Sequence, residues 1–317
     1  MTKIDNKAVP MNLSRSRHSP YYTSRTVDMV FYIVVGILSV ITLYPFIFVI
    51  SSSLSSPMSV ITGRVWLYPI GFSTKAYARL FTSSAIWRAF FNSVAFTGIV
   101  TTLNVLNSML AGYALSKPGL VFRKMFVVMI LIPMYFSGGL IPSFINIVNL
   151  GMYNTPFAII LPMAMSMWNI ILARTFISRL PGSLKESAII DGAGELSVFV
   201  KIILPLSKPI MAVLALYTAL AVWNNWFSFM IYLPQRPDLH PLQMFLTKAL
   251  IWGNMNAALQ MADVVDPEML RDRALEVAVN SQLKYAVMVV ATVPIMLVYP
   301  FVQKYFIQGA LLGSLKE

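Results

Sequence analysis

The chain has 317 residues, of which 57% are hydrophobic and only 11% are charged. Soluble domains carry about 25% charged residues, so this composition excludes an ordinary water-soluble protein and indicates a chain dissolved in lipid. Cysteine is absent, which excludes disulfides and thiolate chemistry, and the two histidines, His18 and His240, lack a metal-ligand spacing. The net charge of +12 is typical of the basic loops of membrane proteins and is not evidence for a nucleic-acid partner.

The first 27 residues are polar and basic, and they contain five Lys or Arg residues. No short apolar segment with a small-residue cleavage site follows them. The first apolar block is instead long, as in a retained membrane helix rather than a cleaved signal peptide. We therefore predict an N-terminal arm over residues 1–27 and a transmembrane domain over residues 28–317.

Six apolar stretches are long enough to cross a bilayer, which takes roughly 20 residues in a helix. Such continuous runs predict α-helices, because in lipid every backbone polar group must be bonded within its own segment. The fold class is therefore an all-α integral membrane protein, with kinks where prolines lie inside the spans. The expected spans are Val30–Ile50, Phe90–Leu115, Met125–Ile141, Phe157–Phe176, Ile210–Leu233 and Tyr285–Phe306.

The distribution of charge in the connections predicts the orientation. With the N-terminus in the cytoplasm, most of the 24 Lys and Arg residues fall on the cytoplasmic side, and six acidic residues fall in the outer connections. This bias predicts an N-in, C-in topology with six spans. Apart from the ends of the spans, we find no Asp, Glu, Lys or Arg within them, which counts against an ion- or proton-coupled carrier but leaves a passive channel open.

The longest outer connection covers residues 234–284. Asp266-Pro267-Glu268 within it is typical of a helix start, with an N-cap, a proline at the first helical position and an acid in the first turn. The stretch Met269–Val279 would continue that helix.

The connection between the fourth and fifth spans, residues 179–209, has the most distinctive pattern. Ser183 and Glu186 have the spacing of a capping box, which predicts a short helix. Asp191-Gly192 predicts a turn, a second helical pattern begins at Glu195, and Leu204-Pro205 ends it. The result is a helix–turn–helix segment whose apolar face has no evident partner within this chain.

This segment resembles the EAA loop of ABC importer permeases, whose consensus is Glu-Ala-Ala, a glycine a few residues later, and Ile-x-Leu-Pro at the end. Serine replaces the first alanine here. The wider stretch from Phe91 to Leu312 is similar to carbohydrate-type permeases, in particular to the polysaccharide and lipoprotein-type group that includes a membrane subunit of the bacterial alginate importer. The residues that carry the loop resemblance are Glu186, Ser187, Ala188, Asp191, Gly192, Ala193, Leu204 and Pro205.

The resemblance implies that residues 179–209 contain a coupling helix that docks into a groove of a separate ATPase subunit. Glu186 would then face a basic residue of the ATPase, and Gly192 would permit the tight turn at the contact. Two alternatives stay open: Glu186 completes a capping box and Asp191 is an ordinary turn residue.

The chain has no G-x-x-x-x-G-K-[ST] phosphate loop, so ATP and Mg²⁺ would be bound by the partner ATPase and no cofactor by this chain. The resemblance implies an ATPase dimer, a second permease subunit, usually a paralogue, and an extracytoplasmic solute-binding protein. The expected location is the bacterial cell membrane, with lipid around the spans.

Polar and aromatic residues within the apolar spans are candidates for the translocation path, because such side chains are placed toward protein or water. Sugars suit aromatic faces flanked by amides, which would fit a saccharide. The alternative interpretation is interhelical hydrogen bonding by asparagine and interfacial placement of tryptophan. The candidates are Asn104, Asn107, Tyr135, Asn169, Trp223, Asn224, Asn225 and Trp226.

We therefore predict the permease subunit of an ATP-driven importer for an oligo- or polysaccharide of the alginate-like class, with no enzymatic activity of its own. An ABC permease for another solute is one alternative. A passive channel or secondary carrier is a second, but neither needs an ATPase-docking loop. A membrane enzyme lacks support, because the spans contain no His/Asp/Glu constellation for acid–base or metal chemistry.

Overall fold

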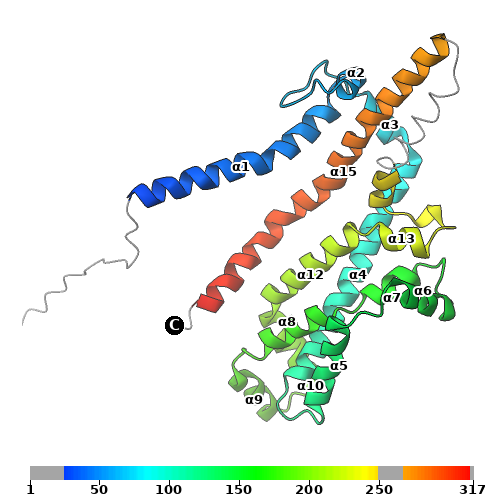
Figure 1. Cartoon of the computed structure of the whole chain (residues 1–317). Helices are drawn as coiled ribbons and strands as arrows, with labels where there is room; N and C mark the ends of the chain where they lie inside the picture. Colours follow the sequence, from blue (N-terminus) through cyan, green and yellow to red (C-terminus); the bar gives the residue numbers. More distant parts are fainter. Residues whose placement is uncertain (1–24, 249–266, 315–317) are drawn as a thin grey trace, which may run out of the picture. The chain divides into compact units, whose positions relative to one another are not determined.

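A computed structural model describes residues 25–248 and 267–314 of the chain, and all regular structure in this part is helical (Figure 1). The all-α class predicted from the sequence is confirmed. The first helices are α1 (Arg25–Ser53), α2 (Pro57–Ile61), α3 (Lys75–Thr82), α4 (Ser84–Ser116), α5 (Arg123–Tyr135), α6 (Leu140–Asn149), α7 (Phe157–Met163) and α8 (Met167–Ile177). They are followed by α9 (Gly182–Ile190), α10 (Glu195–Val198), a π-helical turn (Phe199–Ile203), α11 (Leu204–Leu206), α12 (Lys208–Trp223), α13 (Phe227–Tyr232), a 3₁₀ turn (Pro237–Leu239), a helix at 242–248 and α15 (Pro267–Ser314).

Within the described part, four helical stretches are long and apolar enough to cross a membrane, and the number rises to six if each of two bent helix pairs forms one span. The four are Thr26–Ser53, Ser84–Ser116, Phe157–Ile177 and Leu275–Val298. The bent pairs are α5 with α6, at 115°, and the segment Glu195–Leu206 with α12, at 78°. The six apolar stretches of the sequence therefore all fall on these elements.

The chain divides into two compact units, residues 1–47 and residues 48–317. The described part of the first unit is the main length of α1, which is apolar around its whole circumference. Such a helix suits a membrane span, because a soluble helix would keep one polar face. All further contacts described below lie within the second unit.

Two expected spans are interrupted where the sequence suggested continuous helices. The stretch Met125–Ile141 breaks after Tyr135, because Ser137-Gly138-Gly139 cannot continue the helix and Gly139 adopts a positive φ of 86°. The stretch Ile210–Leu233 breaks at residues 224–226, where the Asn225 carboxamide accepts a hydrogen bond from the Ser228 N–H at 3.1 Å. Asparagine competes in this way with the helical backbone.

The opposite difference occurs near the C-terminus. The predicted helix start at Pro267 is confirmed, but α15 then continues without interruption to Ser314 and merges the expected helix Met269–Val279 with the last expected span. No glycine or proline lies between Glu268 and Val293, so nothing in the sequence stops the helix. The predicted N-cap, Asp266, lies outside the described residues.

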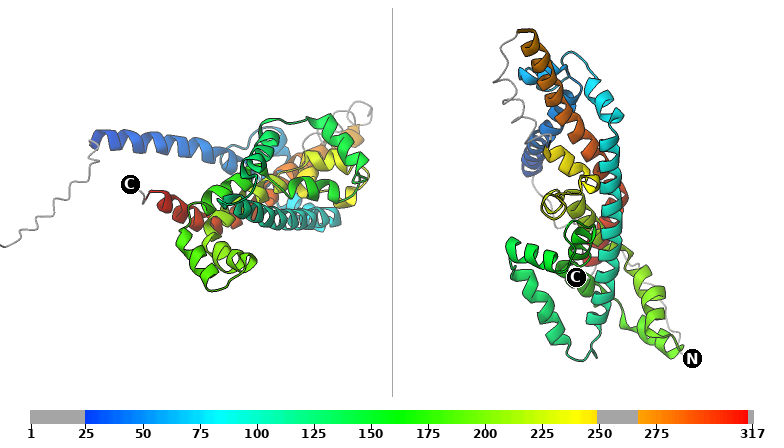
Figure 2. Two further views of the ribbon diagram at one scale, coloured as in Figure 1. Left: turned by 90° about the horizontal axis from the view of Figure 1, so that it is seen from below. Right: turned by 90° about the vertical axis from the view of Figure 1, so that its right-hand side faces the viewer.

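Helix α4 is the element around which the second unit packs. It contacts α8 and α12, and α12 in turn contacts α15. In both views of Figure 2, α9 extends away from the helices that pack on α4. The central cluster of buried side chains joins α4, α8, α12 and the segment after α10, and it comprises Val105, Met109, Tyr113, Ala173, Ile177, Val198, Phe199, Ile203 and Leu214.

The closest approach of two helices in this group is at Gly112 of α4. A Cβ atom added there would lie 2.7 Å from the Ala173 Cβ and 2.8 Å from the Arg174 backbone nitrogen of α8. Both distances are shorter than real Cβ contacts, and one of them involves backbone that cannot rotate away. Glycine at this position therefore sets the distance between α4 and α8.

Replacing Gly112 with alanine should force α4 and α8 apart and destabilise the chain by about 1–3 kcal/mol, as overpacking does elsewhere. Thermal unfolding of the purified chain in detergent measures the effect. Gly98→Ala is the matched control, because it lies on the same helix with nothing within 4 Å of the added Cβ. The control should stay within about 0.5 kcal/mol of the parent. Equal unfolding temperatures for the two variants would show that the close crossing is not a constraint.

Candidate functional site

The loop between α8 and α12 begins with α9. The predicted capping box is wrong, because the helix starts at Gly182 and its N-cap is Pro181, without a side-chain hydrogen bond. Ser183 therefore lies inside the helix. Proline favours this start, since its fixed φ is compatible with helix entry and it needs no N–H partner. Among the described residues, the exposed Glu186 carboxylate makes neither a hydrogen bond nor an ion pair.

Helix α9 ends in a Schellman motif. The Gly192 N–H donates to the Ile189 carbonyl at 3.0 Å, and the Ala193 N–H donates to the Ala188 carbonyl at 2.9 Å. Gly192 has a φ of +81°, the left-handed conformation that this motif places directly after the helix and that favours glycine. The turn expected at Asp191-Gly192 is thus present, with Asp191 as the C-cap of α9.

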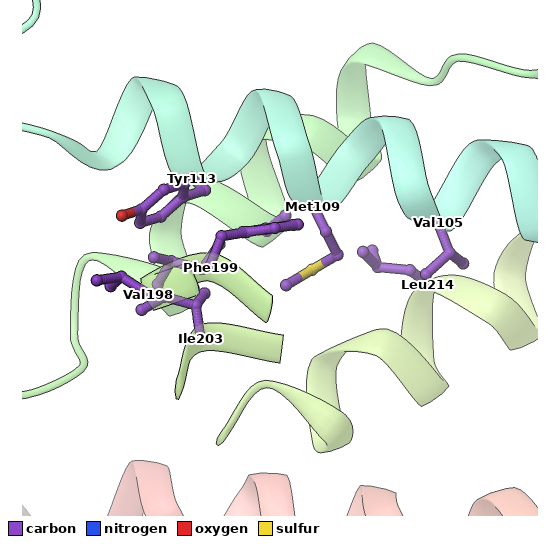
Figure 3. Close-up of a cluster of buried hydrophobic side chains, with 9 residues drawn as sticks. Val105, Met109, Tyr113, Val198, Phe199, Ile203 and Leu214 are labelled. Carbon is purple, nitrogen blue, oxygen red and sulfur yellow. The ribbon is translucent and has the colours of Figure 1, made fainter. Parts of the chain in front are cut away.

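The loop has two different faces. Val198, Phe199 and Ile203 are buried in the central cluster, with Phe199 stacked beside Tyr113 of α4 (Figure 3). On the other face, Ile190 is 85% exposed and Leu196 is 71% exposed. Large apolar side chains this exposed in a protein mark an interaction surface when they are contiguous.

The loop joins α12 through a bend. The π-helical turn over Phe199–Ile203 continues into α11, which contains Leu204 and Pro205 and ends at Ser207. The axis then turns by 78° into α12. A π-helical turn has one more residue per turn than an α-helix and is frequent at functional positions. This junction is therefore suited to passing a movement of the loop on to α12.

A polar network lies where α4, α8 and α12 meet. The Asn104 side-chain oxygen accepts hydrogen bonds from the Asn169 amide at 2.8 Å and from the Thr218 hydroxyl at 3.1 Å. The Asn104 amide donates to the Met163 carbonyl at 2.9 Å, and Asn107 donates to the Ala164 carbonyl at 3.0 Å. Both carbonyls lie at the break between α7 and α8, so asparagines of α4 satisfy backbone groups that the break leaves free.

The same network forms one side of an open cleft of about 470 Å³. Trp168 and Tyr217 flank it and are 53% and 47% exposed. Its lining is aromatic, amide, hydroxyl and thioether, and comprises Asn104, Met163, Met165, Ser166, Trp168, Asn169, Tyr217, Thr218 and Ala221. The cleft therefore offers hydrogen-bonding groups beside aromatic faces, the combination expected for a saccharide.

Two other path candidates, Tyr135 and Trp223, do not line this cleft. Tyr135 is the last residue of α5 and is 72% exposed. Trp223 is buried, and its indole N–H donates to the Ala291 carbonyl of α15 at 3.1 Å. Trp223 thus joins α12 to α15, an interhelical bond that the alternative interpretation assigns to asparagine rather than tryptophan.

The remaining candidates, Asn224, Asn225 and Trp226, form the break between α12 and α13. Asn224 is the C-cap of α12, and its amide donates to the Leu220 carbonyl at 3.0 Å. The Asn225 amide contacts the Met163 sulfur at 3.3 Å, at the edge of the cleft. The sequence analysis did not select Trp168, Tyr217 and Thr218, which line the cleft. The signal that selected Asn104, a polar or aromatic residue within an apolar span, applies to them as well.

A third polar junction ties α4 to the segment after α13. The Asn92 amide donates to the Asp238 and His240 carbonyls at 2.7 and 3.1 Å. His240 is buried, with its Nε2 3.0 Å from the Leu233 carbonyl and its Nδ1 3.2 Å from the Lys248 Nζ. A neutral imidazole fits this arrangement, because Nε2–H donates to the carbonyl while Nδ1 accepts from the ammonium group. Burial is the main cause that lowers the pKa of His240, assisted by Lys248.

The comparisons with known proteins agree with this architecture of membrane helices. Residues 104–311 match the family described as binding-protein-dependent transport system inner membrane component. The chain belongs to this family. It is therefore the membrane-embedded permease subunit of an ATP-driven importer, a transport protein of the cell membrane rather than an enzyme. Among the described residues, no group of three or more His, Asp or Glu could hold a metal ion.

Similar proteins cover almost the whole chain. The polygalacturonan/rhamnogalacturonan transport system permease protein YtcP of Bacillus subtilis is 36% identical over 92% of this chain and 99% of its own length. Protein LplC of the same organism is 34% identical over 92% of this chain and 95% of its own. A chain from the crystal structure of a bacterial ABC transporter involved in the import of the acidic polysaccharide alginate superposes with a TM-score of 0.79 at 31% identity, covering 90% of this chain and 99% of that one.

The asparagine network gives a first prediction. Asn104→Ala removes the acceptor of the Thr218 hydroxyl and the donor to the Met163 carbonyl, which should cost about 1–3 kcal/mol of stability. Asn149→Ala is the matched control on the exposed end of α6 and should change stability by less than about 0.5 kcal/mol. Unfolding temperatures in detergent compare the two. An Asn104 variant as stable as the control would show that the network does not stabilise the helix junction.

The His240 junction gives a second prediction. Because the folded protein lowers the pKa of His240 below its ordinary value of 6.5, the junction is fully stable above that pH and loosens as the pH falls through 6.5. Amide hydrogen exchange at Leu242, whose N–H donates to the Ser93 hydroxyl at 2.8 Å, should accelerate between pH 7.5 and 5.5 after correction for the intrinsic rate. In His240→Gln, which does not titrate, this acceleration should vanish; its persistence would assign the effect to another group.

Proposed function

We propose that this permease imports an oligo- or polysaccharide and that residues 179–209 couple its movement to ATP hydrolysis. The observation that carries the proposal is the two-faced loop. One face is buried against α4, and the other presents Ile190 and Leu196 to the outside. An apolar face of this kind on a loop that is continuous with a bent membrane helix is suited to docking on a partner subunit.

The proposed topology has six spans with both termini in the cytoplasm. The bent pair of α5 and α6 then counts as one span and α12 provides another, and the basic connections fall on the cytoplasmic side. Residues 1–27 form the cytoplasmic arm and residues 28–317 the permease domain, in which residues 179–209 are the coupling loop and residues 234–284 the long outer segment. The outer segment includes the start of α15, which is the natural contact for an extracytoplasmic binding protein.

The proposed coupling surface consists of α9 and its C-terminal turn. Glu186 is exposed and without an intramolecular partner in the described chain, which leaves its charge available to a basic residue of the ATPase. Gly192 provides the tight turn. The remaining residues of this surface or of its connection to α12 are Ser187, Ala188, Asp191, Ala193, Leu204 and Pro205.

The cleft beside Asn104 and Asn169 is the proposed contribution of this chain to the translocation path. Trp168 and Tyr217 offer aromatic faces to sugar rings, and the amides offer donors and acceptors to hydroxyl groups. Because the cleft is open on one side, a second permease subunit would complete the path. Asn225 lies at its edge, whereas Tyr135, Trp223, Asn224 and Trp226 act in helix packing or helix ends.

The substrate class rests on the relatives. The description of one relative names polygalacturonan and rhamnogalacturonan, and that of one solved structure names alginate. These three polymers are acidic polysaccharides. We propose an acidic oligo- or polysaccharide as the solute. An ATPase dimer that binds ATP and Mg²⁺, a second permease and a binding protein complete the importer.

The test is ATP hydrolysis by the reconstituted complex of both permeases and the ATPase, with and without binding protein loaded with oligogalacturonate. Glu186→Ala removes the charge that meets the ATPase and should reduce stimulated hydrolysis about tenfold, as expected for a lost charge-assisted hydrogen bond. Gly192→Asp places a side chain on left-handed backbone and should have a similar effect. Gly194→Asp is the control, because aspartate is favourable at the N-cap of α10.

Stimulation in the parent complex, lost in the Glu186 and Gly192 variants and kept in the Gly194 variant, would establish the coupling role. Saccharide flux through vesicles that contain the permeases without the ATPase, unchanged by either variant, would instead contradict the importer mechanism and leave a channel or carrier. Stimulation by a neutral saccharide alone would overturn the proposed solute class and leave the coupling role intact.

A further inference from the structure

A carboxylate of the loop is held at the end of α4 by two donors. Glu195, the first residue of α10, accepts on the same oxygen from the Tyr113 hydroxyl at 2.7 Å and from the Lys117 Nζ at 2.6 Å. Tyr113 lies in the last turn of α4 and Lys117 is its C-cap. Residues about 80 positions apart in the chain therefore meet in one polar group.

The Tyr113 ring also contacts an aromatic ring and two ammonium groups. Its face packs beside Phe199 with the ring centroids 5.3 Å apart, and it is buried in the central cluster with Val198 and Ile203 (Figure 3). The Lys117 and Lys185 ammonium groups lie 4.8 and 5.8 Å from its ring centroid. Lys185 belongs to α9, so both helices of the loop converge on one side chain of α4.

Glu195 is necessary for this arrangement. Burial and the neighbouring Lys117 lower the pKa of Lys185, while Glu195 opposes this effect. Without the carboxylate, the Lys117 and Lys185 ammonium groups beside the Tyr113 ring would repel each other with no acid between them, and the Tyr113 hydroxyl would lose its acceptor. The Glu195 carboxylate is therefore the acid that Tyr113, Lys117 and Lys185 share.

This cluster is the polar attachment of the loop. Across residues 25–248 and 267–314, the side-chain hydrogen bonds and ion pairs that join residues 178–207 to the rest of the chain are those of Glu195. The loop is continuous with α8 at its start and, through the bend at Ser207, with α12 at its end. The Glu195 group adds a polar connection to α4.

These two helices form facing parts of the cleft. Asn104 lies on α4 nine residues before Tyr113, or about 14 Å along a helix axis, and Tyr217 and Thr218 lie on α12. Apolar packing of Val198, Phe199 and Ile203 also connects the loop to α4, and the Glu195 group adds directional polar bonds at the end of that helix. An attachment to both α4 and α12 moves both sides of the cleft together.

We propose that Tyr113, Lys117 and Glu195 form a latch that makes α4 follow the coupling loop, so that ATPase movement reaches both α4 and α12. The proposal rests on the coupling role assigned to residues 179–209. Tyr113, Lys117 and Glu195 are positioning residues in this scheme and do not contact the solute. The latch stays closed during transport, because its function is to transmit displacement rather than to open.

The test compares ATP hydrolysis and saccharide uptake in the complete reconstituted importer. Glu195→Gln should leave subunit assembly and basal ATP hydrolysis unchanged while reducing the uptake per ATP hydrolysed about tenfold, since it removes a charge-assisted interaction. Tyr113→Phe keeps the ring packed on Phe199 and removes only the hydroxyl, so it tests the latch even if Glu195→Gln does not assemble. It should reduce uptake per ATP in the same direction. Tyr68→Phe is the matched control for Tyr113→Phe, because Tyr68 is an exposed tyrosine between α2 and α3.

Two rescue variants separate a latch from a general effect on stability. The charge exchange of Lys117→Glu with Glu195→Lys should restore uptake per ATP to at least half the parent value. The chain has no cysteine, so Lys117→Cys with Glu195→Cys introduces its only thiols. A short bifunctional thiol cross-linker across this pair should likewise restore uptake that the uncross-linked pair has lost.

Parent-like uptake per ATP in an assembled Glu195→Gln or Tyr113→Phe complex would overturn the latch. The latch would also be overturned if the charge-exchange variant and the cross-linked cysteine pair both assemble and neither recovers uptake per ATP. These outcomes differ from a failure of the proposed function, in which the parent complex itself shows no ATP-dependent saccharide uptake.

Discussion

The rest of the structure depends on the close crossing of α4 and α8 at Gly112. Because no side chain separates the two backbones there, α4 and α8 lie near enough for Asn104 and Asn169 to share a hydrogen bond at 2.8 Å. In lipid, helices gain little from apolar burial against each other, and small residues at their contacts allow the packing that holds them. One helix thereby contributes to the cleft, to the attachment of the loop and, through Asn92, to the outer segment.

The polar residues within the apolar helices do two jobs at once. A break in a membrane helix is tolerated only if the freed backbone groups find partners, and Asn104 and Asn107 supply partners to the Met163 and Ala164 carbonyls. The same asparagine network lines the cleft. Asn104 therefore both forms interhelical hydrogen bonds and lines the cleft. The broken helix accounts for both, because it leaves carbonyl groups without partners and an open space beside them.

The features that the sequence predicted correctly are those that depend on residues close together in the chain. Apolar runs located the membrane helices, and Pro267 marked the start of α15 because proline is favourable there. The predicted Ser183 cap failed because Pro181 starts α9 earlier, a competition between two valid signals that only the folded chain resolves. The pairing of Tyr113 with Glu195 had no local signal, since it joins residues 82 positions apart and depends on the packing of Phe199 against α4.

The lining of the cleft also limits where an acidic solute is recognised. Its described side chains are amide, hydroxyl, aromatic and thioether groups, which bind sugar hydroxyls and ring faces irrespective of carboxylate charge. A buried cation on the path would bind a carboxylate tightly and slow its release, whereas a neutral polar surface lets successive sugar units pass with similar affinity. Under the proposed function, charge selection would therefore belong to the binding protein or the second permease, and this chain would contribute a surface suited to movement. The proposed latch would serve the same end, because moving α4 with α12 would preserve that surface while the complex changes its access from one side of the membrane to the other.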